Sequence, residues 1–172
     1  MTIVDLLGTA DGLDLSDRAQ IERDLEILRQ QHRALVFSRF DTEVALALGL
    51  YVRELSAERG LSVAVDIHGF GGQLFFSRME GTSPNNENWL RRKRNVVRMY
   101  QRSSYEVGRD FALDGTSFEI LEGLPLSDYA AVGGCVPIQV QGAGIVGDIG
   151  VSGLPDRDDH NLAVEALIAF LD

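Results

Sequence analysis

Two glycine-rich segments each separate a pair of strand-like runs, and they restrict the chain to a sheet with antiparallel pairs. Apolar and polar residues alternate in SVAVDIH (62–68), and the glycines of HGFGG then reverse the chain into QLFFSR. A second pair is formed by CVPIQVQ (135–141) and GIVGDIGVSG (144–153). Strands joined by tight hairpins must be antiparallel.

Helical spacing of apolar residues predicts helices around these hairpins. The expected helices are residues 16–31, a helix capped by Asp41 and ended by Gly60, a basic helix from Asn86 or Glu87, a short helix with a capping box at 116–119, and a closing helix after Pro155. A short run at 34–37 adds a fifth strand. We therefore expect an α+β fold with a five-stranded antiparallel sheet flanked by helices. It forms one domain over residues 1–172, with residues 1–15 as an irregular N-terminal arm.

The glycines at 142, 144 and 147 also match G-x-G-x-x-G, the pattern of a dinucleotide-binding loop. That loop must open a helix, whereas the segment after Gly147 reads as an extended strand. Only 25 residues follow Gly147, too few for the rest of a nucleotide-binding half. Gly142 and Gly144 are therefore interpreted as a hairpin turn, and Gly150 as a place where another backbone, a side chain or a ligand lies against the strand.

The charge distribution is uneven. The net charge is -10, yet residues 91–109 contain seven cations and one acid, and Lys93 is the only lysine. The acidic surface argues against a nucleic-acid partner. The chain has no apolar run long enough to span a bilayer and no signal-peptide pattern, so we expect a cytoplasmic protein without a membrane partner. A single cysteine, Cys135, argues against a disulfide or a cysteine-based metal site.

Two histidines are candidate functional residues. His68 shares a strand face with Asp66, so it could ligate haem or a metal, act as a base, or bond to a loop carbonyl at the rim. His160 follows Asp156 by four residues, which fits a metal pair or a solvated ion pair. No third ligand lies near in sequence, so no metal site is predicted.

The basic helix provides the strongest binding candidates: Trp89, Arg91, Arg92 and Lys93. Arginine grips carboxylates and phosphates bidentately, and beside an indole it could hold a flat anion such as haem. The alternative is that the arginines pair with acids of a neighbouring subunit. Gly150 and Ser152 lie near the start of the last helix, which could bind an anion or simply be capped by its own acids. We expect Lys93 to be exposed, and Arg91, Arg94, Arg98 and Arg102 to lie on the exposed side opposite the apolar stripe of this helix.

Three segments resemble an uncharacterised protein family, numbered 0303, within the haem-degrading-domain superfamily: FFSRMEGTSPNNENWLRRKRN, GGCVPIQVQGAGIVGDIGVSGLPDRDDH and the terminal EAL. The resemblance runs from about residue 15 to the C-terminus. It implies a profilin-like α/β/α domain with a five-stranded antiparallel sheet, homo-oligomers built from a dimer, and haem as a candidate cofactor.

These observations lead to three functional hypotheses. The first is a protein that binds haem or another small anionic ligand between the basic helix and the glycine-rich strand. The second is an assembly or adaptor protein that acts through oligomeric docking surfaces. The third is an enzyme with His68 or His160 as acid or base, which ranks last because no nucleophile–base–orienter trio is visible.

Overall fold

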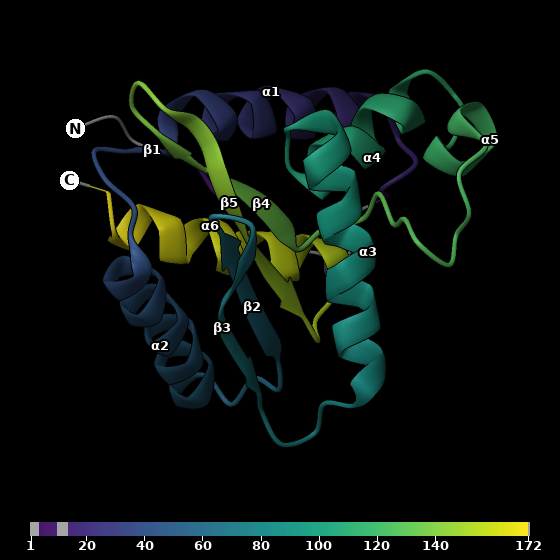
Figure 1. Cartoon of the computed structure of the whole chain (residues 1–172). Helices are drawn as coiled ribbons and strands as arrows, with labels where there is room; N and C mark the ends of the chain where they lie inside the picture. The colour runs from purple at the N-terminus through teal and green to yellow at the C-terminus, as the bar shows by residue number, and fades with distance from the viewer. Residues whose placement is uncertain (1–3, 10–13, 172) are drawn as a thin grey trace.

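The computed structural model describes residues 4–9 and 14–171 (Figure 1). The strands are β1 (Val36–Phe37), β2 (Ala64–Gly69), β3 (Gly72–Arg78), β4 (Cys135–Val140) and β5 (Gly144–Ser152). The helices are α1 (Arg18–Ala34), α2 (Thr42–Glu58), α3 (Pro84–Tyr100), α4 (Ser104–Leu113), α5 (Phe118–Glu122) and α6 (Asp156–Ala169). The predicted α+β class and five-stranded sheet are confirmed.

The strand order in the sheet is β1-β4-β5-β2-β3. Both predicted hairpins are present as antiparallel pairs, and β2 also pairs antiparallel with β5. The edge pair β1–β4 is parallel, so the expectation of a wholly antiparallel sheet is corrected at this edge. The reason is the connection: the chain between β1 and β4 passes through α2 to α5, and no tight turn fixes the relative direction of these two strands.

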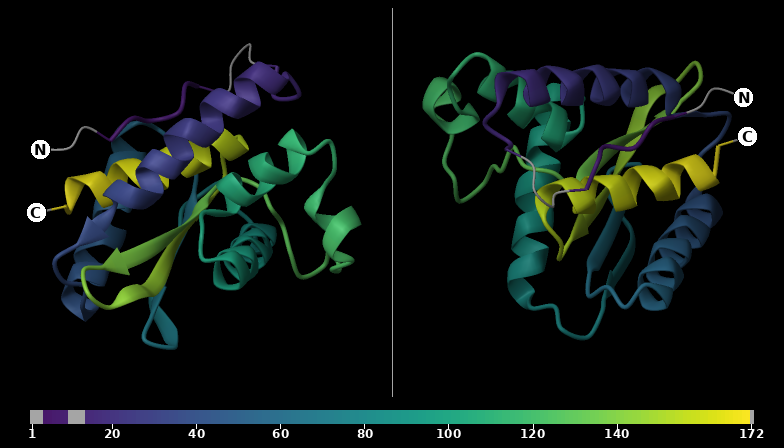
Figure 2. Two further views of the ribbon diagram at one scale, coloured as in Figure 1. Left: turned by 90° about the horizontal axis from the view of Figure 1, so that it is seen from above. Right: turned by 180° about the vertical axis from the view of Figure 1, so that it is seen from behind.

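Helices cover both faces of the sheet (Figure 2). On one face, Val65 and Ile67 of β2 join a large buried apolar cluster that includes residues of α2 and α6. On the opposite face, α3 packs across β5, β4 and β2. Because side chains alternate along a strand, the residues between the core positions, including Asp66 and His68, face α3. The sheet therefore has one apolar and one polar face.

The helix ends follow local sequence signals. The Asp41 carboxylate accepts from the Val44 amide at the start of α2, as predicted, and Gly60 follows the end of that helix with a φ of 65°. Helix α3 begins before the predicted position, because Ser83 caps it through a capping box with Asn86 and Pro84 fixes the first turn.

Two further predicted segments are described only in part by the structure. Ser117, and not Thr116, is the N-cap of α5, and the Glu119 side chain lies outside the described residues. In the expected N-terminal arm, residues 1–3 and 10–13 also lie outside them. Residues 4–9 form no helix or strand, and the Leu7 amide and carbonyl both bond to the Asn161 side chain of α6.

The glycine-rich stretch that matches G-x-G-x-x-G is a hairpin turn followed by β5, as predicted. Gly142 and Gly144 have φ values of 76° and 80° at the turn between β4 and β5. At Gly150, the β-carbon of any larger residue would lie 2.8 Å from Leu90 Cδ2, so the α3 side chain occupies the space that the glycine leaves. Gly150 is therefore a packing position.

Candidate functional site

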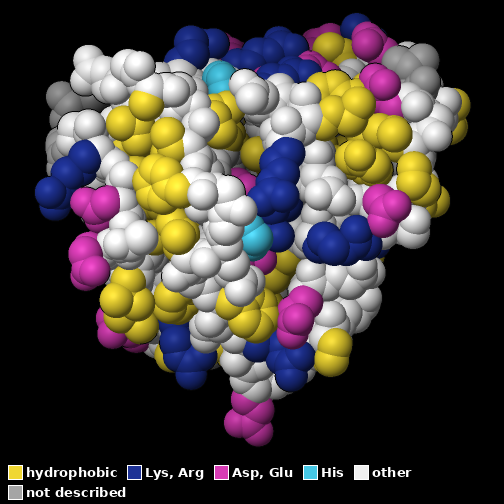
Figure 3. All heavy atoms as spheres, in the orientation of Figure 1, with side chains coloured by type: hydrophobic (Ala, Val, Ile, Leu, Met, Phe, Trp, Pro, Cys, Tyr) yellow, Lys and Arg dark blue, Asp and Glu magenta, His cyan; other side chains and the backbone are white. Residues whose placement is uncertain are grey.

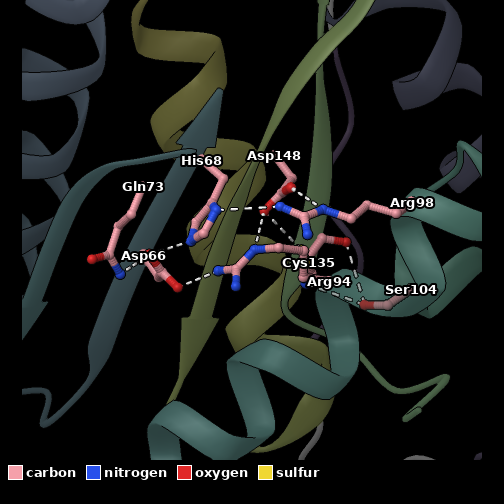
Figure 4. Close-up of polar contacts among 8 residues, drawn as sticks. All are labelled: Asp66, His68, Gln73, Arg94, Arg98, Ser104, Cys135 and Asp148. Carbon is pink, nitrogen blue, oxygen red and sulfur yellow. Dashed lines mark hydrogen bonds and ion pairs between the residues drawn. The ribbon is translucent and has the colours of Figure 1, made fainter. Parts of the chain in front are cut away.

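A polar cluster lies between α3 and the sheet (Figure 4). Asp66 and His68 extend from β2, Asp148 extends from β5 opposite His68, and Arg94 and Arg98 extend from α3. Strand alternation places the three sheet residues on the face that α3 covers. The cluster is thus a consequence of sheet register and of α3 crossing the polar face.

Arg94 is the buried centre of this cluster. Its guanidinium donates to Asp148 Oδ1 at 2.9 Å and also pairs with the Asp66 carboxylate. Burial raises the pKa of Asp148, and the charge of Arg94 opposes that shift. A planar guanidinium can hold two carboxylates at once, so Arg94 fixes the positions of both. The expectation that Arg94 is exposed is wrong, because two carboxylates of the sheet pair with it in the interior. The sequence of the helix alone does not reveal these partners.

His68 is held at both ring nitrogens. Its Nε2 lies 3.4 Å from Asp66 Oδ1, and its Nδ1 lies 3.3 Å from the Arg98 guanidinium. Because arginine can only donate, Nδ1 carries the lone pair and Nε2 carries the proton that faces Asp66. Burial, followed by the nearby charge of Arg94, lowers the pKa of His68. The ring is therefore neutral at neutral pH, and its Nδ1 lone pair faces the Arg98 guanidinium.

His68 lies between two cavities. One, of about 320 Å³, is lined by Val97 and Arg98 of α3, by Gln101 directly after this helix, and by glycine-rich backbone of the β2–β3 turn and β5. The other, of about 530 Å³, is lined by Asp66, Gln73, Phe76, Arg91 and Arg94 among others. Figure 3 shows a histidine beside basic side chains in a hollow between the β2–β3 hairpin and α3. Both volumes fall within the range of about 300–1,000 Å³ that is typical of small-molecule pockets.

Backbone strain gathers around the 320 Å³ cavity. Phe70 and Gln101, with φ values of 53° and 56°, are the only non-glycine residues with positive φ in the part of the chain that the structure describes. Gln101 lines the cavity, and Phe70 lies in the turn between the lining residues Gly69 and Gly71. A left-handed conformation is unusual for a bulky aromatic residue, and such strain clusters at functional sites.

Three of the predicted binding residues line a separate cavity of about 230 Å³: Trp89, Lys93 and Ser152. Lys93 is buried there, with its ammonium 3.0 Å from Asp159 Oδ2 and 3.2 Å from the Val151 carbonyl. The expectation of an exposed Lys93 is therefore wrong. Burial raises the pKa of Asp159 to about 6.

The other predicted residues of the basic helix have partners within the chain. Arg91 pairs with Asp128 at 3.0 Å and donates to the Ser127 carbonyl at 2.6 Å, and it also lines the 530 Å³ cavity. The Arg92 guanidinium lies 4.2 Å from the centre of the Trp89 ring. The Arg91 contacts attach α3 to the segment before β4, and the Arg92 contact lies within α3, so pairing with a neighbouring subunit is not needed to explain them.

His160 lies apart from His68. It is buried, its Nε2 is 2.8 Å from Gln31 Oε1, and burial lowers its pKa to about 3. Among residues 4–9 and 14–171, no group of three or more His, Cys, Asp or Glu side chains is placed to hold a metal ion. The structure thus places the eight predicted residues in several locations: His68 and Arg91 at the polar cluster and its cavities, Trp89, Lys93 and Ser152 at the third cavity, Arg92 stacked on Trp89, Gly150 beneath α3, and His160 in the interior.

Sequence reasoning missed Arg98, Asp148 and Gln101 as members of the site. Arg98 was one of several arginines on the helix, and nothing local set it apart. Asp148 could have been found from hairpin register, since it pairs with His68 across β2 and β5. No sequence pattern indicated Gln101, because its left-handed backbone conformation follows from the position at which α3 ends.

Comparisons with known proteins place the chain in a family. The family model described as haem degrading protein HbpS-like matches residues 40–168. The chain belongs to the HbpS-like family. It is 48% identical to a UPF0303 protein of Paraburkholderia phymatum, over 88% of this chain and 92% of that protein. It is also 48% identical to a UPF0303 protein of Azotobacter vinelandii, with the same coverage.

Solved structures share the fold of this HbpS-like chain. The Ybr137w protein superposes with a TM-score of 0.81 at 28% identity, covering 92% of this chain and 94% of its own. The structure of HbpS gives a TM-score of 0.60 at 22% identity, over 78% and 91% of the two chains. A PduOC–haem complex gives 0.63 at 20% identity, over 77% and 95%.

Proposed function

We propose that this protein binds a small anionic ligand, with haem as the leading candidate, in the 320 Å³ cavity between α3 and β5. The observation that carries the proposal is the pair formed by His68 and Arg98. A neutral imidazole lone pair and a guanidinium meet at one wall of a cavity that is otherwise lined by glycine backbone, apolar side chains, Gln101 and the Asp148 carboxylate, and Asp148 is paired with Arg94. Such a combination of a few convergent polar groups with apolar walls is typical of ligand sites.

The residues present fit haem. Histidines that ligate a metal usually donate their second ring N–H to a carboxylate, and His68 directs Nε2 toward Asp66 in this way. His68 would hold the iron through Nδ1, and Val97, Ile145 and Val146 would contact the porphyrin face. Bound haem would supply redox-active iron. The PduOC–haem complex shares the fold and supports this choice of ligand.

Arg98 would recognise the anionic group. Its side chain is 54% exposed, and its distance to Asp148 is 3.9 Å, so Asp148 holds it less firmly than it holds Arg94. Arg98 would leave His68 Nδ1 and pair with a propionate or another carboxylate when the ligand enters. Arg94 is buried between two acids and would keep Asp66 in position against His68.

A haemin titration followed by the Soret absorption band tests the proposal. The unaltered protein should give a saturable Soret shift with one site per chain. His68→Ala should abolish the shift, and Arg98→Gln should weaken binding. His32→Ala provides a matched control, because His32 lies at the end of α1 away from this cavity. Equal titrations of His68→Ala and the unaltered protein would contradict the assignment.

A second function, assembly through docking surfaces, is favoured by one observation. Leu46 and Leu50 lie one helical turn apart on α2 and are 45% and 44% exposed. Two exposed leucines on one helix face fit an interface with a second copy of the chain. Light scattering of Leu46→Glu/Leu50→Glu tests this: the unaltered protein should be at least dimeric and the variant smaller. A monomeric unaltered protein would exclude self-assembly.

No helix among the described residues is long and apolar enough to span a membrane.

A further inference from the structure

A second, interior polar site lies where α1, α4, α6 and β4 meet. A cavity of about 10 Å³ is lined there by His32, Ser103, Glu106 and His160, together with apolar and amide side chains. Three of these residues each have one buried polar atom without a hydrogen-bond partner among the described residues: His32 Nδ1, Glu106 Oε2 and His160 Nδ1. Buried polar atoms are nearly always hydrogen-bonded, so three around one cavity call for a shared partner.

The protonation of His160 is fixed by its neighbours. Gln31 donates through its amide nitrogen to the Asp5 carbonyl at 2.7 Å, so its Oε1 faces His160 Nε2 at 2.8 Å. An amide oxygen only accepts, and Nε2 must therefore carry the proton. Burial keeps the ring neutral by lowering its pKa to about 3. His160 Nδ1 is consequently an acceptor that needs a donor.

The other two unpaired atoms, Glu106 Oε2 and His32 Nδ1, are an acceptor and a donor. Glu106 Oε1 accepts from Arg102 at 3.2 Å, and Oε2 of the same carboxylate is a second acceptor. His32 Nδ1 can donate when its ring is in the Nδ1–H tautomer. The three unpaired atoms therefore comprise two acceptors and one donor, while the Ser103 hydroxyl at the cavity wall already accepts from the Glu106 amide. One water molecule donates two hydrogen bonds and accepts the third.

We propose that this cavity is a binding site for a single ordered water molecule, which donates to His160 Nδ1 and Glu106 Oε2 and accepts from His32 Nδ1. The volume of about 10 Å³ is close to the lower limit for one water molecule. Buried waters make about three hydrogen bonds, the number available here. The water would link α1, α4 and α6, whose side chains otherwise leave these three polar atoms without a partner among the described residues.

Two histidines and a carboxylate are also metal-ligand types, although no three such side chains among the described residues are placed to hold a metal ion, so the test is designed to separate water from metal. A high-resolution crystal structure of the full chain, with data collected at the zinc and iron absorption edges, does so. The expected result is one density peak within hydrogen-bonding distance of all three atoms, with no anomalous signal. An anomalous peak would show a metal ion and overturn the water assignment. Absence of any peak would also overturn it.

A variant pair tests whether the three partners act together. His32→Leu removes the donor from a half-buried position and should eliminate the peak or markedly reduce its occupancy. His68→Leu is the matched control, because His68 lines the other cavities, and it should leave the peak unchanged. A peak of full occupancy in His32→Leu would show that His32 is no partner and would contradict the proposed site.

Discussion

Replacing Gly150 by valine tests the packing of α3 on the polar face of the sheet. A β-carbon at this position would lie 2.8 Å from Leu90 Cδ2, closer than van der Waals contact permits, and Leu90 is almost fully buried. Valine adds two further methyl groups, so Leu90 or the helix must shift. Overpacking of this kind costs about 1–3 kcal/mol. Valine is the better strand former, but the whole preference scale spans only about 1 kcal/mol and offsets part of the loss.

Urea unfolding followed by circular dichroism measures the effect. We expect Gly150→Val to lower the free energy of unfolding by about 1–3 kcal/mol, which moves the midpoint down by roughly 0.5–1.5 M at an m-value of about 2 kcal/mol/M. Gly72→Val is the matched control. Gly72 lies in strand β3, has no positive φ, and a β-carbon there would meet no atom within 4 Å. This control should keep or slightly raise the stability.

A double-mutant cycle with Leu90→Ala identifies the colliding side chain. Truncation of Leu90 makes room for the valine, so the two substitutions together should cost less than the sum of their separate costs by about 0.5–3 kcal/mol. Stability of Gly150→Val equal to that of the unaltered protein would refute the close-packing argument. Strict additivity in the cycle would show that Leu90 is not the residue that excludes the valine.

Two other predictions concern buried charge. Arg94→Met leaves Asp66 and Asp148 without their shared cation and should cost about 3–5 kcal/mol at neutral pH. Because burial raises the pKa of Asp148, protonation relieves the loss, and the deficit in urea unfolding should shrink from pH 7 to pH 4; a deficit independent of pH would contradict this. Burial lowers the pKa of His160 from 6.5 to about 3. Between these two pH values His160 binds a proton in the unfolded chain but not in the folded chain. Stability is therefore lost as pH falls from about 6.5 toward 3, and His160→Gln should make that loss smaller; an unchanged pH profile would refute it. Asp159 has the opposite effect, because its raised pKa of about 6 removes stability as pH rises, so each variant must be compared with the unaltered protein at the same pH.

Local patterns in the sequence were sufficient for most of the fold. The glycine turns and alternating runs predicted both hairpins, and the Asp41 cap placed the start of α2. The parallel pairing of β1 was not predictable in this way. That strand has two residues, and its partner β4 lies about a hundred residues later, so no local pattern sets their relative direction.

The site was only partly predictable for a related reason. Alternation placed Asp66 beside His68, and the structure confirms that contact. Exposure of Lys93 and Arg94 was expected from helix composition, because charged residues are rarely buried without partners. Their partners, Asp159 and Asp148, come from elements more than fifty residues away. Burial of a charge depends on such long-range pairing, which one sequence does not reveal.

The crystal structure of the protein grown with haemin, with iron located by its anomalous scattering, tests the central claim most directly. The proposed function predicts a single iron peak bonded to His68 Nδ1, with a propionate at Arg98 in the cavity between α3 and β5. Iron bound at His32 or His160, haem seated beside Trp89, or the absence of iron from a crystal whose haemin titration saturates would contradict it.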